Sequence, residues 1–402
     1  MTILPSDQDA SGRSFGAEEI DLLTEVIESG RLFAPKGRFV KDLETGFARW
    51  LGVDHSVASS SGTAAIHTAL AAIDPEPGDE VITTSITDIG GLTPILYQGA
   101  LPVFADVDAR TGNVTAETVE DRISERTRAI MVTHLFGNPA QVREICDLAD
   151  RYDVPVVEDC AQAFGATVAG AKVGGFGVMG TFSLQQGKHI TTGEGGLTAT
   201  TNPHFAKMMR LFVNKAWDYE DPTDHDFLAL NYRMAELQGA VGLAQLDRLD
   251  AGVETRRANA RSLDERIAAI DGIEPVTVAP DAASSYWRYC LLVDGNAVTG
   301  GPDALAEKLR DLGVASAPRY IKKPAFRTRV FAEQKTFGSS RWPFTLARPE
   351  AVDYSDELFP GTLDFLRHVL VLPWNERMDD GHIDRIAEAL ATGVAGLGQE
   401  AA

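Results

Sequence analysis

The sequence predicts an α/β protein with a mostly parallel sheet that helices cover on both faces. From about residue 56, short apolar segments alternate with helical patterns. This alternation is typical of parallel strands joined by helices. Because 402 residues exceed what one compact core usually holds, we expect a large domain over residues 1–255 and a smaller C-terminal α+β domain over residues 256–402.

The first expected helix covers residues 17–29. Ile20, Leu23 and Ile27 recur at helical spacing there, and Gly30 follows where a helix would end. Further helices are expected over TAAIHTALAAI, over residues 141–151 and 203–213, from residue 235 into the 260s as one long helix, and over residues 303–312 and 381–391.

The expected strands are short apolar segments. In chain order the main sheet would take SVASS, EVITT, LPVFADV, AIMVTH and PVVED, followed after residue 180 by TFSLQ and GLTATT. We assign YWRYCLLV to the smaller domain, as a strand among helices and Pro-rich connections.

The composition excludes several functions. The formal net charge of −21 would repel phosphate backbones, so we expect no nucleic-acid partner. No apolar run reaches about 18 residues, so we expect no membrane span. The first residues lack a basic patch followed by an apolar stretch, so we expect no secretory signal and a cytoplasmic location.

Cysteine and histidine show no pattern typical of a metal centre. Cys146, Cys160 and Cys290 are scattered, so we expect three buried thiols and neither disulfides nor a zinc site. The histidines lack metal-ligand spacing, and we predict no metal.

Asp159 follows Val156 and Val157, which places it at the carboxyl end of a parallel strand. The simplest interpretation is a helix cap or a surface turn. Open α/β sheets, however, bind their ligands at this end of the strands. A carboxylate there could hold the protonated pyridine nitrogen of pyridoxal phosphate, which makes the cofactor ring an electron sink.

Lys188 lies in TFSLQQGKHITTGEGG, five residues after Ser183. A lysine in a Gly- and Thr-rich turn is usually a solvated surface residue. This one lies between two apolar strands and about 30 residues beyond Asp159. If it is desolvated its pKa falls, and it can then form a Schiff base with the cofactor and later move a proton.

A third segment, SSSGTAAIHTAL, turns from a strand through Gly62 and Thr63 into a helix. Taken alone it would be an ordinary helix cap. The free N–H groups at a helix start also bind anions, and glycine allows a phosphate to approach closely. Together with Asp159 and Lys188, the segment predicts a phosphate site to which Ser183 donates its hydroxyl.

Taken in this order, these segments resemble the DegT/StrS family of sugar and cyclitol aminotransferases, over roughly residues 15–395. The resemblance implies fold type I of the pyridoxal-phosphate enzymes, with a large domain built on a mostly parallel mixed sheet. The motifs that carry it are SSGTAAI, GDEVI, PVFADVD, HLFGNPA, VEDCAQAFGA, FSLQQGKHITTGEGG, NYRMAELQGAVGLAQLDRLD and VLPWNERMDD.

The resemblance also implies roles for single residues. Lys188 would carry pyridoxal 5′-phosphate as a Schiff base, Asp159 would bind the pyridine nitrogen, and Gln162 would contact the phenolic oxygen. Asn231 would reach the phosphate of the neighbouring subunit, which implies a homodimer with shared active sites. The phosphate ligands would be Gly62, Thr63 and Ser183, and the substrate pocket would include Asn214, Lys215, Tyr320 and Glu194.

One position departs from the family pattern, and His189 raises a separate question. Most relatives place an aromatic ring over the cofactor where this chain has Asp88. Either another side chain covers that face, or the alignment slips, or Asp88 contacts substrate; we keep it among the cofactor-binding candidates. Relatives that replace the lysine by histidine are sugar dehydratases, but His189 is one position too late for that role and we expect it to be structural.

The resemblance implies an aminotransferase that moves an amino group from glutamate or glutamine to a keto-cyclitol or keto-sugar, with pyridoxamine phosphate as intermediate. The form QQGKHITTGEGG is more similar to the cyclitol and aminoglycoside branch, so we expect antibiotic or amino-sugar biosynthesis. One alternative acceptor is a keto-sugar linked to dTDP, UDP or GDP. Two alternative functions are a pyridoxal-phosphate-dependent sugar dehydratase and a non-catalytic regulator that binds the cofactor.

Overall fold

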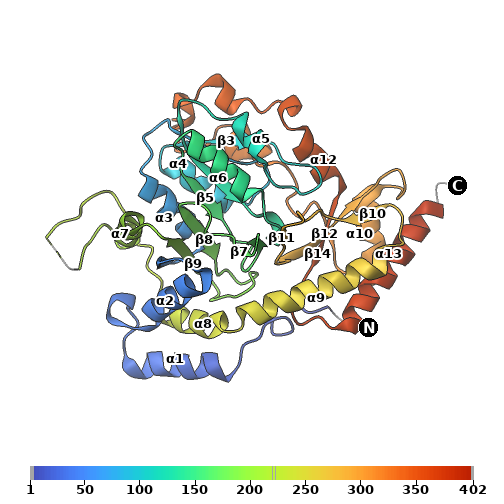
Figure 1. The fold of residues 1–402 in the computed structure, drawn as a ribbon, viewed down its shortest axis with the longest axis horizontal. Helices are drawn as coiled ribbons and strands as arrows, with labels where there is room; N and C mark the ends of the chain where they lie inside the picture. Colours follow the sequence, from blue (N-terminus) through green and yellow to red (C-terminus); the bar gives the residue numbers. More distant parts are fainter. Residues whose placement is uncertain (1–3, 220, 222, 400–402) are drawn as a thin grey trace.

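The computed structural model describes residues 4–219, 221 and 223–399 (Figure 1). The strands of its main sheet are β1 (His55–Ser59), β2 (Glu80–Thr84), β3 (Leu101–Ala105), β4 (Thr127–Thr133), β5 (Val156–Asp159), β8 (Met179–Ser183) and β9 (Gly196–Thr200). They lie in the order β1-β9-β8-β5-β4-β2-β3. β9 runs antiparallel to both neighbours, whereas β8, β5, β4, β2 and β3 pair in parallel. The predicted α/β fold is confirmed.

Helices cover both faces of this sheet, because neighbouring residues of a buried strand point to opposite faces. Met131 packs with Ile66 and Met209 on one face, and Ile130 packs with Ile145 on the other. The covering helices are α3 (Gly62–Ile73), α4 (Thr93–Tyr97), α5 (Ala116–Glu120), α6 (Val142–Arg151) and α7 (Pro203–Phe212).

A helical layer lies below the sheet in Figure 1, formed by α1 (Ala17–Ser29), α2 (Phe39–Leu51) and α8 (Glu236–Leu246). The predicted first helix is confirmed, and Gly30 ends it with a φ of 64°. The buried carboxylate of Glu236 accepts hydrogen bonds from the backbone N–H groups of Phe39 at 2.8 Å and Val40 at 3.1 Å. It therefore caps the start of α2, where negative charge is stabilised.

The long helix expected from residue 235 onward is two helices in the structure. α8 ends at Leu246 and α9 (Leu249–Ile267) follows after a turn. α8 packs on α1 and α2, whereas α9 packs on the last helix of the chain. The prediction of one helix was wrong because periodicity reports a buried face and does not show that the neighbouring element changes along it.

A second sheet is antiparallel throughout, in the order β10-β12-β14-β13. α9 runs from the main sheet to this one, so the predicted domain boundary after residue 255 falls inside a continuous helix (Figure 1). That boundary stays a prediction. The elements here are β10 (Ile273–Pro275), β12 (Arg288–Val293), β13 (Ala317–Pro318), β14 (Val369–Pro373), α10 (Gly301–Asp311), α12 (Pro360–His368) and α13 (Asp380–Gln399), and a small third sheet joins β11 (Ala282–Ala283), β6 (Thr167–Val168) and β7 (Ala171–Lys172).

Part of the C-terminal half returns to the main sheet. Phe326, Phe331 and Phe344 pack with Phe104 of β3 in one aromatic cluster. These residues lie around α11 (Arg329–Ala332), within the stretch that the sequence assigns to the smaller domain. The two predicted domains therefore share more than the helix α9.

The cysteines are free thiols in the structure. Cys160 and Cys290 are buried as expected, whereas Cys146 is half-buried. None of the helices formed by the described residues is long and apolar enough to span a membrane.

Glu158 is a fully buried carboxylate in the middle of the molecule. Its Oε1 accepts hydrogen bonds from the N–H groups of Phe176 and Gly177, and its Oε2 accepts one from Gly174 at 2.7 Å. The Nε2 of buried His134 lies 3.1 Å from the same Oε2. Glu158 therefore holds the turn before β8 against the centre of the sheet by hydrogen bonds, and both carboxylate oxygens have hydrogen-bond partners inside the protein.

We expect Glu158→Ala to lower the free energy of unfolding by about 3–5 kcal/mol, because it leaves buried donors without an acceptor. Denaturant unfolding followed by circular dichroism measures this change. Glu120→Ala is the control: its ion pair with Arg151 is exposed, and its loss should cost about 1 kcal/mol or less. Equal effects of the two substitutions would contradict the structural role of Glu158.

Candidate active site

The predicted site residues gather at the carboxyl edge of the main sheet. Asp159 ends β5 and Ser183 ends β8, and these strands are parallel neighbours. β1 lies on the other side of β9 from β8, ends at Ser59 at the same edge of the sheet, and leads into α3. Because parallel strands end at the same edge, side chains from separate parts of the sequence come together there.

Lys188 lies in the loop between β8 and β9, which we call the lysine loop (residues 184–195). Its Nζ lies 4.4 Å from the centroid of the Trp287 ring. Burial lowers the pKa of Lys188 to about 8; Asp159 and Asp88 act against this shift, whereas Arg288 adds to it. About a tenth of such an amine is neutral and nucleophilic at pH 7, far more than for an ordinary lysine.

Asp159 is buried at the end of β5. The N–H of Ala161 donates to its Oδ1 at 3.1 Å, and the Thr133 hydroxyl makes only a long bond of 3.4 Å to its Oδ2. Burial raises the pKa of Asp159, against the Ala161 N–H, Lys188, His134 and Thr133. The Oδ2 atom can therefore accept a further hydrogen bond, and a cationic N–H beside it would offset the cost of burying the charge.

Aromatic rings form a wall beside these two residues. The Phe136 and Trp287 rings are stacked with centroids 6.3 Å apart, and the Tyr320 ring meets both edge-on. Gln162 is buried and its Oε1 accepts a hydrogen bond from the Phe136 N–H at 2.7 Å. Gln162 and Tyr320 are thus joined through this wall to Lys188.

The predicted phosphate ligands also meet. A Cβ added to Gly62 would lie 2.6 Å from the Cβ of Ser183, so only glycine fits against that strand end. Ser61 caps α3 through the N–H of Ala64, and the N–H groups of Gly62 and Thr63 belong to the first helical turn, which has no intrahelical acceptors. The cradle has the donors and the dipole direction that suit a phosphate, so these residues fit the cofactor.

Asp88 lies at the rim of this cradle. It is exposed, and its carboxylate accepts a hydrogen bond from the N–H of Gly90 at 2.8 Å, capping the short helix Ile89–Gly91. A Cβ on Gly90 would lie 2.6 Å from the Thr63 hydroxyl, so this turn abuts the phosphate ligands. An aromatic contact to Lys188 comes instead from Trp287, on a different element.

The remaining candidates lie in two other places. Asn214 and Asn231 form an isolated antiparallel bridge, and the buried Asn214 side chain donates to the Trp217 carbonyl at 2.6 Å. Lys215 and Asn231 are exposed beside it. Glu194 is exposed in the lysine loop, and its carbonyl accepts a hydrogen bond from Gln238.

His189 is buried in the lysine loop, directly after Lys188. Its Nε2 lies 3.1 Å from the Ser285 carbonyl, which makes this nitrogen the donor. Burial, with Arg256 nearby, lowers the pKa of His189, so the ring is neutral. These contacts support the structural role expected for it.

Sequence reasoning missed Trp287, Arg288 and Arg13. The first two appear in YWRYCLLV, which was interpreted only as a strand, although both precede or open the buried part of β12. The signal that could have indicated them is a tryptophan next to an arginine at the start of an otherwise apolar segment. Arg13 lies before the first helix and carries no motif signal.

Comparison with known proteins identifies relatives over nearly the whole chain. The DegT/DnrJ/EryC1/StrS aminotransferase family matches residues 13–391. The chain is 36% identical over 319 residues to GDP-perosamine synthase of Caulobacter vibrioides, covering 79% of this chain and 85% of that protein. It is 35% identical over 336 residues to L-glutamine:2-deoxy-scyllo-inosose aminotransferase of Streptomyces kanamyceticus, covering 77% and 78%.

A solved structure has the same fold. The 3-amino-5-hydroxybenzoic acid synthase superposes with a TM-score of 0.87 at 27% identity, over 98% of this chain and 100% of that one. Fold type I and the dependence on pyridoxal phosphate, both expected from the resemblance, are confirmed. The chain therefore belongs to the DegT/DnrJ/EryC1/StrS aminotransferase family and is a pyridoxal-phosphate-dependent aminotransferase.

Proposed function

We propose that the chain transfers the amino group of L-glutamate or L-glutamine to the ketone of a cyclitol or sugar, with Lys188 as the residue that carries the cofactor. The observation that supports this most directly is the desolvated Lys188 amine close to buried Asp159, next to a glycine cradle for phosphate. Strongly shifted titratable groups in one crevice are typical of catalytic sites.

The side chains would divide the work as follows. Pyridoxal phosphate supplies an aldehyde that carries the amino group and a ring that withdraws electrons. Asp159 keeps the ring nitrogen protonated through its Oδ2. Lys188 Nζ would take a proton from the α-carbon of the donor and pass it to the cofactor, and with the acceptor it would move a proton from the cofactor to the carbon that gains the amine. Gln162 orients the phenolic oxygen, and Gly62, Thr63 and Ser183 bind the phosphate.

We expect Lys188→Ala to fold normally and to lower the transfer rate at least about 1000-fold, because the carrier and the general base are lost together. The absorbance of the bound cofactor before and after addition of L-glutamine or L-glutamate measures the first half of the reaction. Lys172→Ala is the control, since this lysine donates to the Trp50 carbonyl away from the site.

Full activity of Lys188→Ala would refute the assignment of the carrier. A wild-type protein that holds the cofactor but converts it with neither amino donor would instead favour the sugar dehydratase.

For the acceptor we propose a keto-cyclitol or free keto-sugar first, following the form of the lysine loop. A nucleotide-linked keto-sugar is the second candidate, and a groove of about 1260 Å³ beside α2 and α7 favours it. Asn214 lines this groove. Several basic side chains line it as well, together with the acidic residues Glu44, Asp54 and Asp218. The basic residues are Lys36, Lys41, Arg49, Lys207, Arg210 and Arg233.

Competition with GDP, UDP and dTDP separates the two acceptors. If the acceptor is a cyclitol, we expect millimolar nucleoside diphosphate to change the rate of amine transfer less than about two-fold, because no subsite binds the diphosphate. The measurement is the return of the aldehyde-form absorbance when a keto-cyclitol is added to the aminated enzyme. Strong inhibition by one nucleotide, with no turnover of cyclitols, would establish the second candidate instead.

We further propose a homodimer with shared active sites, in which Asn231 serves the partner. Asn231 is exposed on its own chain, and large apolar side chains of and near α1 are exposed as well. These are Phe15, Ile20, Ile27, Leu32 and Phe33. An apolar group of this kind is typical of an interface between copies.

Mixing two inactive variants tests the shared site. Lys188→Ala and Asn231→Ala subunits, produced together, should regain about a quarter of the wild-type activity, because half of the dimers then hold one site with both native residues. Activity is measured for each variant alone and for the mixture at equal total concentration. No recovery in proven mixed dimers would contradict the exchange of Asn231 between subunits.

A further inference from the structure

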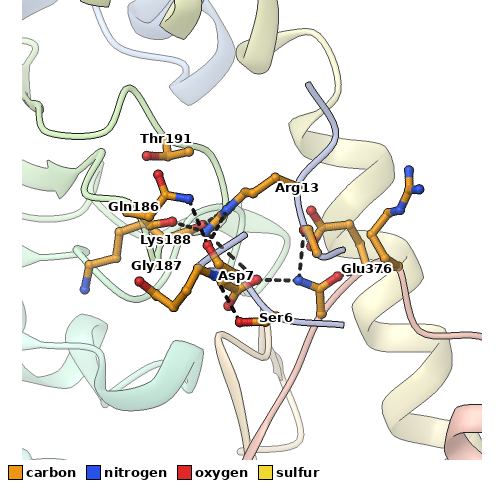
Figure 2. Close-up of polar contacts among 12 residues, drawn as sticks. Ser6, Asp7, Arg13, Gln186, Gly187, Lys188, Thr191 and Glu376 are labelled. Carbon is orange, nitrogen blue, oxygen red and sulfur yellow. Dashed lines mark hydrogen bonds and ion pairs between the residues drawn. The ribbon is translucent and has the colours of Figure 1, made fainter. Parts of the chain in front are cut away.

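Residues 5–14, which we call the strap, lie against the lysine loop (Figure 2). Arg13 and Asp7 are both buried, at 5% and 7% exposure. The strap folds on itself: the Ser6 N–H donates to the Ser11 hydroxyl, and a Cβ on Gly12 would lie 2.4 Å from the Ser6 carbonyl. It is therefore a packed element of the site.

Three consecutive carbonyls of the lysine loop are held from outside the loop. The guanidinium of Arg13 donates to the carbonyl of Lys188 at 2.8 Å and to that of Gln186. The indole N–H of Trp287 donates to the carbonyl between them, that of Gly187, at 2.6 Å. A planar arginine fork on two carbonyls fixes direction as well as position.

Asp7 joins these two contacts. Its backbone carbonyl accepts from Arg13 Nε at 2.9 Å and from the Gln186 amide at 3.0 Å. Its carboxylate pairs with Arg288 at 2.9 Å and accepts from Asn375, both in or beside the second sheet. Arg13 is thus held in place by a residue that also touches the neighbour of Trp287.

We propose that Arg13 is a positioning residue that sets the amine of Lys188 beside Asp159 and Trp287 by holding the backbone on which Lys188 is mounted. Figure 2 shows the Lys188 side chain extending away from the strap, so Arg13 acts through the backbone and does not touch the reacting atoms. The inference rests on the proposed role of Lys188 for its significance.

The alternative is that Arg13 only stabilises the fold by pairing buried carbonyls. The two interpretations differ in what happens at Lys188. If the fork positions the loop, its loss admits water to the amine, and the burial that lowers the pKa of Lys188 to about 8 is reduced. If the fork only stabilises the fold, the variant protein that still folds keeps the Lys188 amine in the same position and with the same pKa.

The test uses Arg13→Lys, which keeps the positive charge but cannot hold both carbonyls in one plane. Protein freed of pyridoxal phosphate is labelled with acetic anhydride at a series of pH values, and the midpoint for Lys188 is read by mass spectrometry. We expect a midpoint near 8 in the wild type and a rise of about half a unit or more in Arg13→Lys, toward the ordinary lysine value. Hydrogen exchange of residues 184–195 should accelerate about ten-fold in the same variant.

Arg385→Ala is the matched control. Arg385 lies on α13, is half-buried, and donates to the Leu312 carbonyl at 2.7 Å. It should change neither readout. Arg13→Ala removes both the positive charge and the two hydrogen bonds to the loop carbonyls. If Arg13→Ala shifts the midpoint and Arg13→Lys does not, the effect is one of charge, and the positioning role is overturned.

An unchanged midpoint and unchanged exchange in Arg13→Lys overturn it as well. Both readouts are made without cofactor or substrate. The role of Arg13 can therefore be refuted while the proposed aminotransfer holds, and it can be supported even if the aminotransfer is refuted.

Discussion

The removal of Lys188 and Asp159 from water at one edge of the sheet is the constraint on which the site depends. Burial disfavours both charged forms, lowering the pKa of the lysine and raising that of the aspartate, while their mutual attraction opposes both shifts. Neither charge would be tolerable alone at this depth. The protein therefore needs an anchored carboxylate, an anchored lysine and little freedom for either.

The carboxylate is anchored by the register of β5. Glu158 and Asp159 are neighbours, so they point to opposite faces of the sheet. Glu158 accepts hydrogen bonds from the turn before β8 and has His134 beside it, whereas Asp159 keeps an oxygen with only a long bond from Thr133. A slip of one residue would exchange the carboxylate that holds the turn before β8 for the one that lies beside Lys188.

The lysine is anchored differently, because it lies in a loop. The loop depends on groups from two distant parts of the chain: Arg13 from the strap and Trp287 from the residue before β12 of the second sheet. Loops position chemistry well only when a rigid scaffold holds them. The contacts of Asp7 make the strap and the second sheet one such scaffold, which links the position of the smaller sheet to the position of the amine.

The sequence by itself determined the α/β fold, the first helix with Gly30 at its end, the placement of Asp159 at a strand end and that of Lys188 between two strands, because hydrophobic period and turn residues are local properties. It did not predict the break between α8 and α9, the half-buried Cys146, or the exposed place of Asp88 at the rim. Nor did it indicate Arg13 and Trp287. Those were decided by tertiary structure: a periodic pattern states that a face is buried, but which distant side chain donates to which carbonyl depends on how separate elements pack in space.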